Sequence, residues 1–149
     1  IRATSDASDM EPQDYVILTV KAPALPGIAP SLMPLLGPQT TIVTAMNGVP
    51  WWFCHALTGP LAGRTLSSTD PNGLLGETLT RDRLLGCVVH AGASVPEPGV
   101  VDHAAGNQFI VGDAGRHLSA PASVLAEALT NAGLNGRTSD DIHGEIWMK

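Results

Sequence analysis

The chain has 149 residues, of which 44% are hydrophobic and only 15% are charged, a length and composition that suit a domain with a buried core. Its 14 acidic and 8 basic side chains give a net charge of -6, and so few cations argue against binding to nucleic acid or to an anionic membrane. No apolar run reaches the roughly 20 residues of a membrane helix, and residues 1–11 lack the pattern of a signal peptide.

The two cysteines, Cys54 and Cys87, lie far apart in the sequence and show no CxxC or Cys/His spacing. They therefore predict neither a zinc site nor a disulfide framework. We expect no bound metal and a reducing, cytoplasmic setting.

Two short apolar runs predict neighbouring parallel strands. Residues 15–20 and 41–46 are rich in β-favouring side chains without alternation, which is typical of strands buried on both faces. Between them, residues 25–36 have apolar positions at near-helical spacing but also a proline at every fourth position. Interior prolines break helices, so this segment predicts a short or kinked crossover helix within a βαβ unit.

The middle of the chain predicts a helix, a loop and a strand. Pro50 follows the second strand at a position typical of the first turn of a helix, and residues 58–76 are rich in turn formers. Residues 84–91 form a third apolar run and predict a third strand.

The last third predicts a hairpin and two helices. Residues 98–103 and 108–111 predict antiparallel strands joined by a turn at 104–107. Ser119 is the predicted N-cap of a helix that Gly133 ends, and we expect Asp140 or Asp141 to cap a final helix. Together these elements predict an α/β fold.

Lys21 and Asn47 directly follow the first two predicted strands. Because parallel strands end at one edge of a sheet and ligands bind there, a cation and a side-chain amide should meet at one rim. A lysine can bind a phosphate, and an asparagine can bind an amide or a carbonyl. The structural alternative is that Lys21 reaches into solvent and that Asn47 belongs to a turn.

Lys149 shares one face of the final predicted helix with Ile142 and Ile146, because the three positions fall within about 60° at 100° per residue. A lysine on this inward stripe would be desolvated and would be a competent proton donor. The alternative is a surface lysine paired with Glu145 at the i, i+4 spacing.

Several other residues carry weaker signals. His90 and His103 show no ligand-like spacing, and strand histidines are more often packed than catalytic. Trp51 and Trp52 either line a pocket or divide between core and surface. Gly92 ends the third predicted strand near the rim, where a small residue would allow a ligand to approach closely.

Four segments in this order resemble the ketopantoate reductases (2-dehydropantoate 2-reductases): Val20-Lys21-Ala22, Met46-Asn47-Gly48, Pro98-Gly99-Val100-Val101, and Asp141 to Lys149. The resemblance implies a Rossmann-type NADP-binding domain followed by an all-helical domain. It also implies an oxidoreductase that uses NADPH to reduce the ketone of 2-dehydropantoate to (R)-pantoate in pantothenate biosynthesis.

The resemblance implies a role for four residues. Lys21 matches the family's cofactor-contacting lysine, and Asn47 matches the asparagine that lies between nicotinamide and substrate. Gly92, or Ala91 beside it, lies where the family contacts the cofactor. Lys149 matches the lysine that binds the substrate and acts as general acid.

The chain contains no G-x-G-x-x-G turn, with which the family holds the cofactor pyrophosphate. We therefore expect an interior fragment. Residues 1–139 would be the C-terminal part of the cofactor domain, without its first strands and glycine-rich turn, and residues 140–149 the first helix of the helical domain. The expected partners are a small 2-keto acid and a second copy of the protein in a homodimer.

Two alternatives remain open. The protein could be a reductase of another 2-keto acid or ketone on the same fold, because fold and cofactor do not fix the substrate. Alternatively, the chain could be a non-catalytic fragment, because it lacks the phosphate-binding turn. In either case we expect the 149 residues alone to be inactive.

Overall fold

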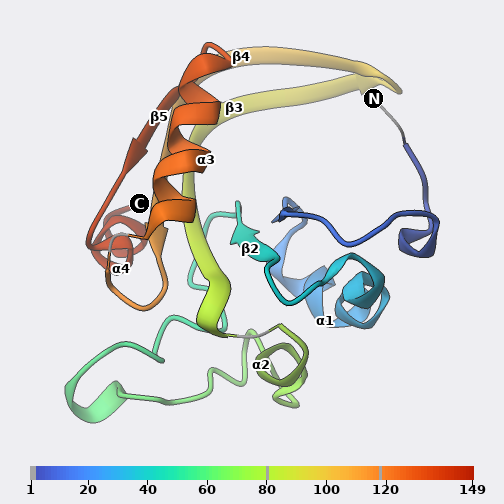
Figure 1. Ribbon diagram of the computed structural model, residues 1–149. Coiled ribbons are helices and arrows are strands. Elements are labelled where there is room, and N and C mark those ends of the chain that lie inside the picture. Colours follow the sequence, from blue (N-terminus) through green and yellow to red (C-terminus); the bar gives the residue numbers. More distant parts are fainter. Residues whose placement is uncertain (1–2, 80, 118) are drawn as a thin grey trace.

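The computed structural model describes residues 3–79, 81–117 and 119–149, in which five strands form one mixed sheet (Figure 1). The first two residues of the predicted cofactor domain lie outside these ranges. The sheet order follows the sequence: β1 (Tyr15–Leu18), β2 (Thr41–Thr44), β3 (Leu84–Glu97), β4 (Val100–Asp113) and β5 (Asn135–Thr138). Strands β1, β2 and β3 are parallel, β4 is antiparallel to β3, and β5 is parallel to β4. The α/β class and the βαβ unit predicted from the sequence are confirmed.

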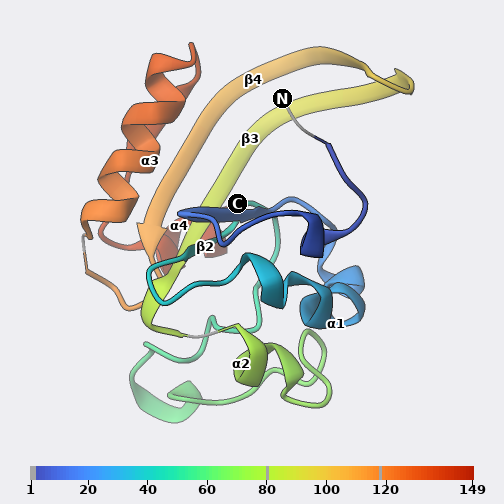
Figure 2. The same ribbon diagram turned by 45° about the vertical axis from the view of Figure 1, so that its right-hand side comes forward.

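The two faces of the sheet pack against different layers. One face contacts the crossover between β1 and β2, the two buried tryptophans, the short helix α2 (Leu74–Thr78) and α4 (Ile142–Met148). The other face contacts α3 (Ala120–Asn131), which lies along β3 and β4 in Figures 1 and 2.

Strand β2 is buried along its whole length, as predicted, but β1 is not. Ile17 is 49% exposed, because α3 covers the central strands and does not extend over the whole of β1. The expectation that both strands are buried on both faces is therefore wrong for β1.

The crossover between β1 and β2 is broken into short turns, as its prolines predicted. A 3-10 helix at Ala22–Ala24 leads into α1 (Leu25–Ile28), which continues as a second 3-10 helix at Ala29–Leu35. Leu25 and Ala29 are buried against the sheet. Because each proline removes a helical hydrogen bond, the segment packs through its apolar face without forming one long helix.

The helix predicted from Pro50 is wrong, because residues 51–56 form consecutive turns. The amide of Phe53 bonds the carbonyl of Pro50 at 3.1 Å, and the amide of His55 bonds that of Trp52 at 2.9 Å. The four residues Trp51–Cys54 are all buried. A surface helix would turn part of such a run to solvent, so the burial of successive side chains favours an irregular backbone.

The hairpin predicted between residues 98–103 and 108–111 is wrong, because residues 100–103 and 108–111 both lie in the single strand β4, which pairs with β3 instead. Strands β3 and β4 pair from Glu97 and Val100 at the tip, so the chain reverses at residues 98–99 and not at 104–107. Gly106 has a φ of +71° and lies beside a shift in the β3–β4 register, so the turn-like composition at 104–107 marks a bulge. The two-stranded ribbon formed by β3 and β4 extends well beyond the other strands (Figures 1 and 2).

Strand β5 was not predicted from the sequence, because its residues Asn135–Thr138 carry no apolar pattern. Helix α3 begins after Ser119 and is followed by Gly133 at a φ of +85°, as predicted, but the Ser119 side chain makes no capping hydrogen bond. Asp141 caps α4, where its carboxylate accepts from the Gly144 amide at 3.3 Å.

Helix α4 packs directly on the sheet over two glycines. Gly86 of β3 and Gly112 of β4 are register partners, and a Cβ atom at either position would lie 2.7 Å from the Ile142 side chain. A Cβ at Gly86 would also lie 3.0 Å from Trp52. Only glycine leaves room for this contact, which fixes the position of α4 and of the residue that follows it.

Candidate functional site

Lys21 and Asn47 both line an open cleft at the carboxyl ends of β1 and β2. The cleft has a volume of about 520 Å³, and Val89 of β3 contributes to its lining. Both polar residues are exposed. Because β3 is longer than β1 and β2, it continues past this rim and supplies backbone groups to it.

Asn47 and Lys149 bind the same residue of β3. The Asn47 Oδ1 accepts a hydrogen bond from the Val89 amide at 3.3 Å, and the Lys149 Nζ donates to the Val89 carbonyl at 2.9 Å. Lys149 Nζ also lies 3.1 Å from Nδ1 of His90. Side chains from three separate parts of the sequence therefore gather at one end of the sheet.

Lys149 differs from both interpretations of its position in the sequence. Ile142 is buried and Ile146 is half-buried, as the inward stripe predicts, but Lys149 is exposed, so the expected desolvation is wrong. The alternative ion pair with Glu145 is also wrong, because Glu145 binds Arg137 at 2.8 Å. Lys149 instead reaches sideways to β3, since the apolar stripe ends one turn before it.

The sequence predicts that the third strand ends near Gly92, but the structure shows that it does not. Strand β3 continues to Glu97, and Gly92 is paired with Ala105 inside the exposed ribbon. Gly92 lines neither the cleft of Lys21 nor the narrow crevice beside Lys149. A Cβ atom there would make an ordinary 3.7 Å contact, so the described residues impose no close approach.

Sequence reasoning missed the contribution of Val89 and His90. A backbone group has no signature in the sequence, and His90 has no informative spacing to another polar residue. Only the topology could have indicated these two residues. Strand β3 runs parallel to β2, so the residues that follow the buried part of β3 lie beside Asn47.

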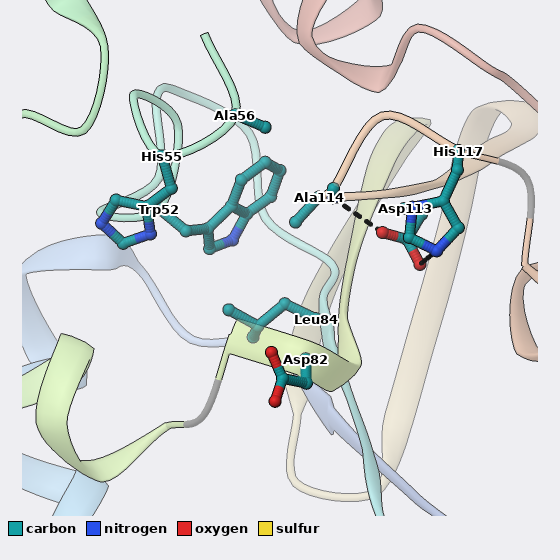
Figure 3. Close-up of a pocket in the computed structure, with 9 residues that line it drawn as sticks. Trp52, His55, Ala56, Asp82, Leu84, Asp113, Ala114 and His117 are labelled. Carbon is teal, nitrogen blue, oxygen red and sulfur yellow. Dashed lines mark hydrogen bonds and ion pairs between the residues drawn. The ribbon is translucent and has the colours of Figure 1, made fainter.

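A second hollow of about 330 Å³ lies at the opposite end of the sheet (Figure 3). Trp52 and His55 face Asp113 and His117 across it, and Asp82 lies at its edge. Both carboxylate oxygens of Asp113 have partners, one the Gly115 amide at 2.7 Å and the other His117 Nε2 at 3.4 Å. Trp51 and Trp52 are buried core residues, each with at most 2% of its surface exposed.

Two further properties concern the described ranges only. They contain no group of three His, Cys, Asp or Glu side chains that could hold a metal ion. None of their helices has the length and apolar character needed to cross a membrane.

A sheet of this topology, with polar side chains gathered at the carboxyl ends of its parallel strands, defines a Rossmann-like α/β domain. The family model described as "Ketopantoate reductase PanE/ApbA" matches residues 1–51. A curated 2-dehydropantoate 2-reductase from Mesorhizobium japonicum is 39% identical over 149 residues, which are 100% of this chain and 46% of that relative.

The crystal structure of a protein provisionally named a ketopantoate reductase, from Ralstonia solanacearum, is 40% identical. It matches 99% of this chain and 46% of its own with a TM-score of 0.93. The resemblance to ketopantoate reductases that the four sequence segments predicted is confirmed. The chain spans slightly less than half the length of these relatives.

The fold is shared more widely. D-mandelate dehydrogenase, solved with NADH, matches 90% of this chain and 38% of its own with a TM-score of 0.67. At 22% identity this likeness concerns the fold alone.

Proposed function

We propose that the protein carrying this chain reduces 2-dehydropantoate to (R)-pantoate with NADPH, a step of pantothenate biosynthesis. The observation that carries the proposal is the convergence of Asn47 and Lys149 on Val89, next to the cleft of Lys21. The proposal is further supported by the 39% identity to a 2-dehydropantoate 2-reductase.

The cleft at the rim fits part of a dinucleotide cofactor. It is open, it has a lysine for an anionic group, and it has an asparagine for an amide or carbonyl. Lys21 and Asn47 would contact NADPH there, and we keep Gly92 as a proposed contact from the family resemblance. When bound, NADPH supplies the hydride.

Lys149 has the hydrogen-bonding capacity of a general acid. Its ammonium has three N–H groups, of which one donates to Val89 and one points to His90. The third is left for the ketone oxygen of a substrate at the rim. As negative charge develops on that oxygen, this N–H stabilises it and transfers the proton.

Asn47 orients the reacting groups. Its Oδ1 is held by the Val89 amide, so its NH2 group is directed away from that bond and can donate to a carbonyl. Because this contact fixes the side chain before substrate binds, it lowers the entropic cost of positioning.

We also propose the domain division. Residues 1–139 belong to the cofactor domain, and residues 140–149 begin the helical domain that completes the substrate site. The family resemblance supports this division, and the close packing of Ile142 over Gly86 and Gly112 would join the first helix of the helical domain rigidly to the cofactor domain.

The test is to express the complete protein and follow NADPH oxidation with 2-dehydropantoate, phenylglyoxylate and pyruvate as substrates. The proposal predicts the highest kcat/KM for 2-dehydropantoate and a preference for NADPH over NADH. A higher kcat/KM for another 2-keto acid would establish the alternative substrate class, and no turnover of any of them would overturn the proposal.

Three further properties have their own measurements. Calorimetric titration of the isolated 149 residues should show weak or no NADPH binding, because the pyrophosphate-binding turn is not among them. Tight binding would contradict this expectation. Light scattering of the complete protein tests the proposed homodimer, and cell fractionation tests the proposed cytoplasmic location.

A further inference from the structure

His90 lies at the rim without a role in the proposed reaction. It is half-buried on β3, directly after Val89, and its Nδ1 is 3.1 Å from the Nζ of Lys149. Resting on the function proposed above, we propose that His90 is a positioning residue: its Nδ1 accepts a hydrogen bond from Lys149 and aims the ammonium at the substrate.

Lys149 depends on this contact because its other partner is a single backbone carbonyl. The Val89 oxygen at 2.9 Å fixes one N–H direction, and rotation about that bond leaves the remaining two undetermined. A second acceptor at His90 removes this freedom. Glu145, the nearest acidic residue in sequence, binds Arg137 and makes no ion pair with Lys149 among the described residues.

The backbone of β3 is shaped to present His90. The β3–β4 register shifts immediately after the pair formed by His90 and Gln108, which is the signature of a bulge. Opposite it, Gly106 adopts a φ of +71°, and a Cβ atom at that position would overlap the His90 carbonyl. Bulges redirect the side chains beside them, so this distortion accounts for a strand histidine that reaches the end of α4.

The proposed positioning role requires one particular tautomer of the neutral His90 imidazole. Nδ1 accepts a hydrogen bond from an ammonium only when it carries no proton, so His90 must be neutral with its proton on Nε2. A proton on Nδ1 would turn the contact into a clash between two donors. This requirement gives the proposal a signature that does not depend on catalysis.

The kinetic test uses the complete protein with two replacements. His90→Leu keeps a similar size and removes the acceptor, whereas His90→Asn places an amide oxygen close to the position of Nδ1. We expect His90→Leu to lower kcat about tenfold with KM values within about threefold, and His90→Asn to retain most of kcat. Wild-type kcat in His90→Leu, or equal losses in both variants, would overturn the proposal.

The second test is spectroscopic and separates this inference from the proposed function. In 15N-histidine-labelled complete protein, two-bond 1H–15N spectra should show His90 as the Nε2–H tautomer, with an Nδ1 resonance that moves in Lys149→Met. An Nδ1–H tautomer, or a resonance that does not respond to Lys149→Met, would overturn the proposal. Absence of reductase activity would overturn the proposed function and leave this measurement intact.

Discussion

The two ends of the sheet both form hollows lined by polar side chains, yet they differ in how those side chains are used. In the hollow at the amino ends of the parallel strands, here called the amino-end hollow, the Asp113 carboxylate binds Gly115 and His117, which follow it closely in the sequence (Figure 3). At the carboxyl end, residues 21, 47 and 149 converge from distant parts of the sequence.

The difference is also one of charge. Asp82 and Asp113 line the amino-end hollow, whereas Lys21 and Lys149 lie at the carboxyl rim. The dinucleotide and the 2-keto acid of the proposed function are both anionic, so their charge favours the rim with its lysines over the hollow with its carboxylates. The polar groups of the first hollow bind residues next to them in the sequence, whereas those of the rim come from distant segments, which is the arrangement that the proposed ligand site requires.

The largest expected effect is the loss of the proposed general acid. Lys149→Ala in the complete protein should lower kcat by a factor of roughly 10² to 10⁴, because proton donation and charge stabilisation are both removed. Steady-state kinetics measures it. The matched control is His117→Ala at the amino-end hollow, which should leave kcat within about twofold because His117 is exposed. Comparable losses in the two variants would erase the distinction between the ends.

The next effect concerns the packing that places Lys149. Gly112→Ala introduces a Cβ atom 2.7 Å from both Ile142 and the Ser139 carbonyl, so we expect a loss of about 1–3 kcal/mol in the free energy of unfolding, and a lower kcat as α4 shifts. Denaturant unfolding measures the first quantity. Gly27→Ala is the control, because no atom lies within 4 Å of its Cβ position. Equal stability of the two variants would show that α4 tolerates displacement.

A smaller effect should come from the cation in the open cleft. Lys21→Ala should raise the KM for NADPH about tenfold, equivalent to about 1.4 kcal/mol, and leave kcat nearly unchanged. Lys21→Arg keeps the charge and should stay close to wild type. If kcat falls and the KM for NADPH does not move, Lys21 acts on the chemistry rather than on cofactor binding.

The smallest effect is on stability against acid. His143 is buried between Trp52 and Phe53, and this burial, together with the Arg116 guanidinium, holds the pKa of its imidazole below the ordinary value. The unfolded chain therefore binds the proton more readily. The stability that the neutral His143 side chain contributes is therefore fully present above a pH of about 6.5. This contribution is lost as the pH falls toward the lowered pKa.

Melting curves between pH 7.5 and 5 measure this loss, which should be a few degrees larger in wild type than in His143→Phe, on the order expected for 1 kcal/mol. Parallel curves for the two proteins would show that His143 does not contribute to acid sensitivity.

Much of the sheet and part of the rim could be predicted from the sequence. Apolar runs located β1, β2 and β3, and strand ends located Lys21 and Asn47, because burial and parallel topology leave clear patterns. The bulge at Gly106 and the edge strand β5 could not be predicted, since a bulge has the composition of a turn and an exposed edge strand needs no apolar side chains. The sideways reach of Lys149 depends on packing at Gly86 and Gly112.

The central claim, that the carboxyl rim and not the amino-end hollow binds the cofactor, is tested most directly by hydrogen–deuterium exchange of the complete protein with and without NADPH. We predict that NADPH protects the peptides covering residues 19–23 and 45–49, and leaves residues 82–84 and 113–117 unchanged. Protection of the second pair without the first would contradict the claim.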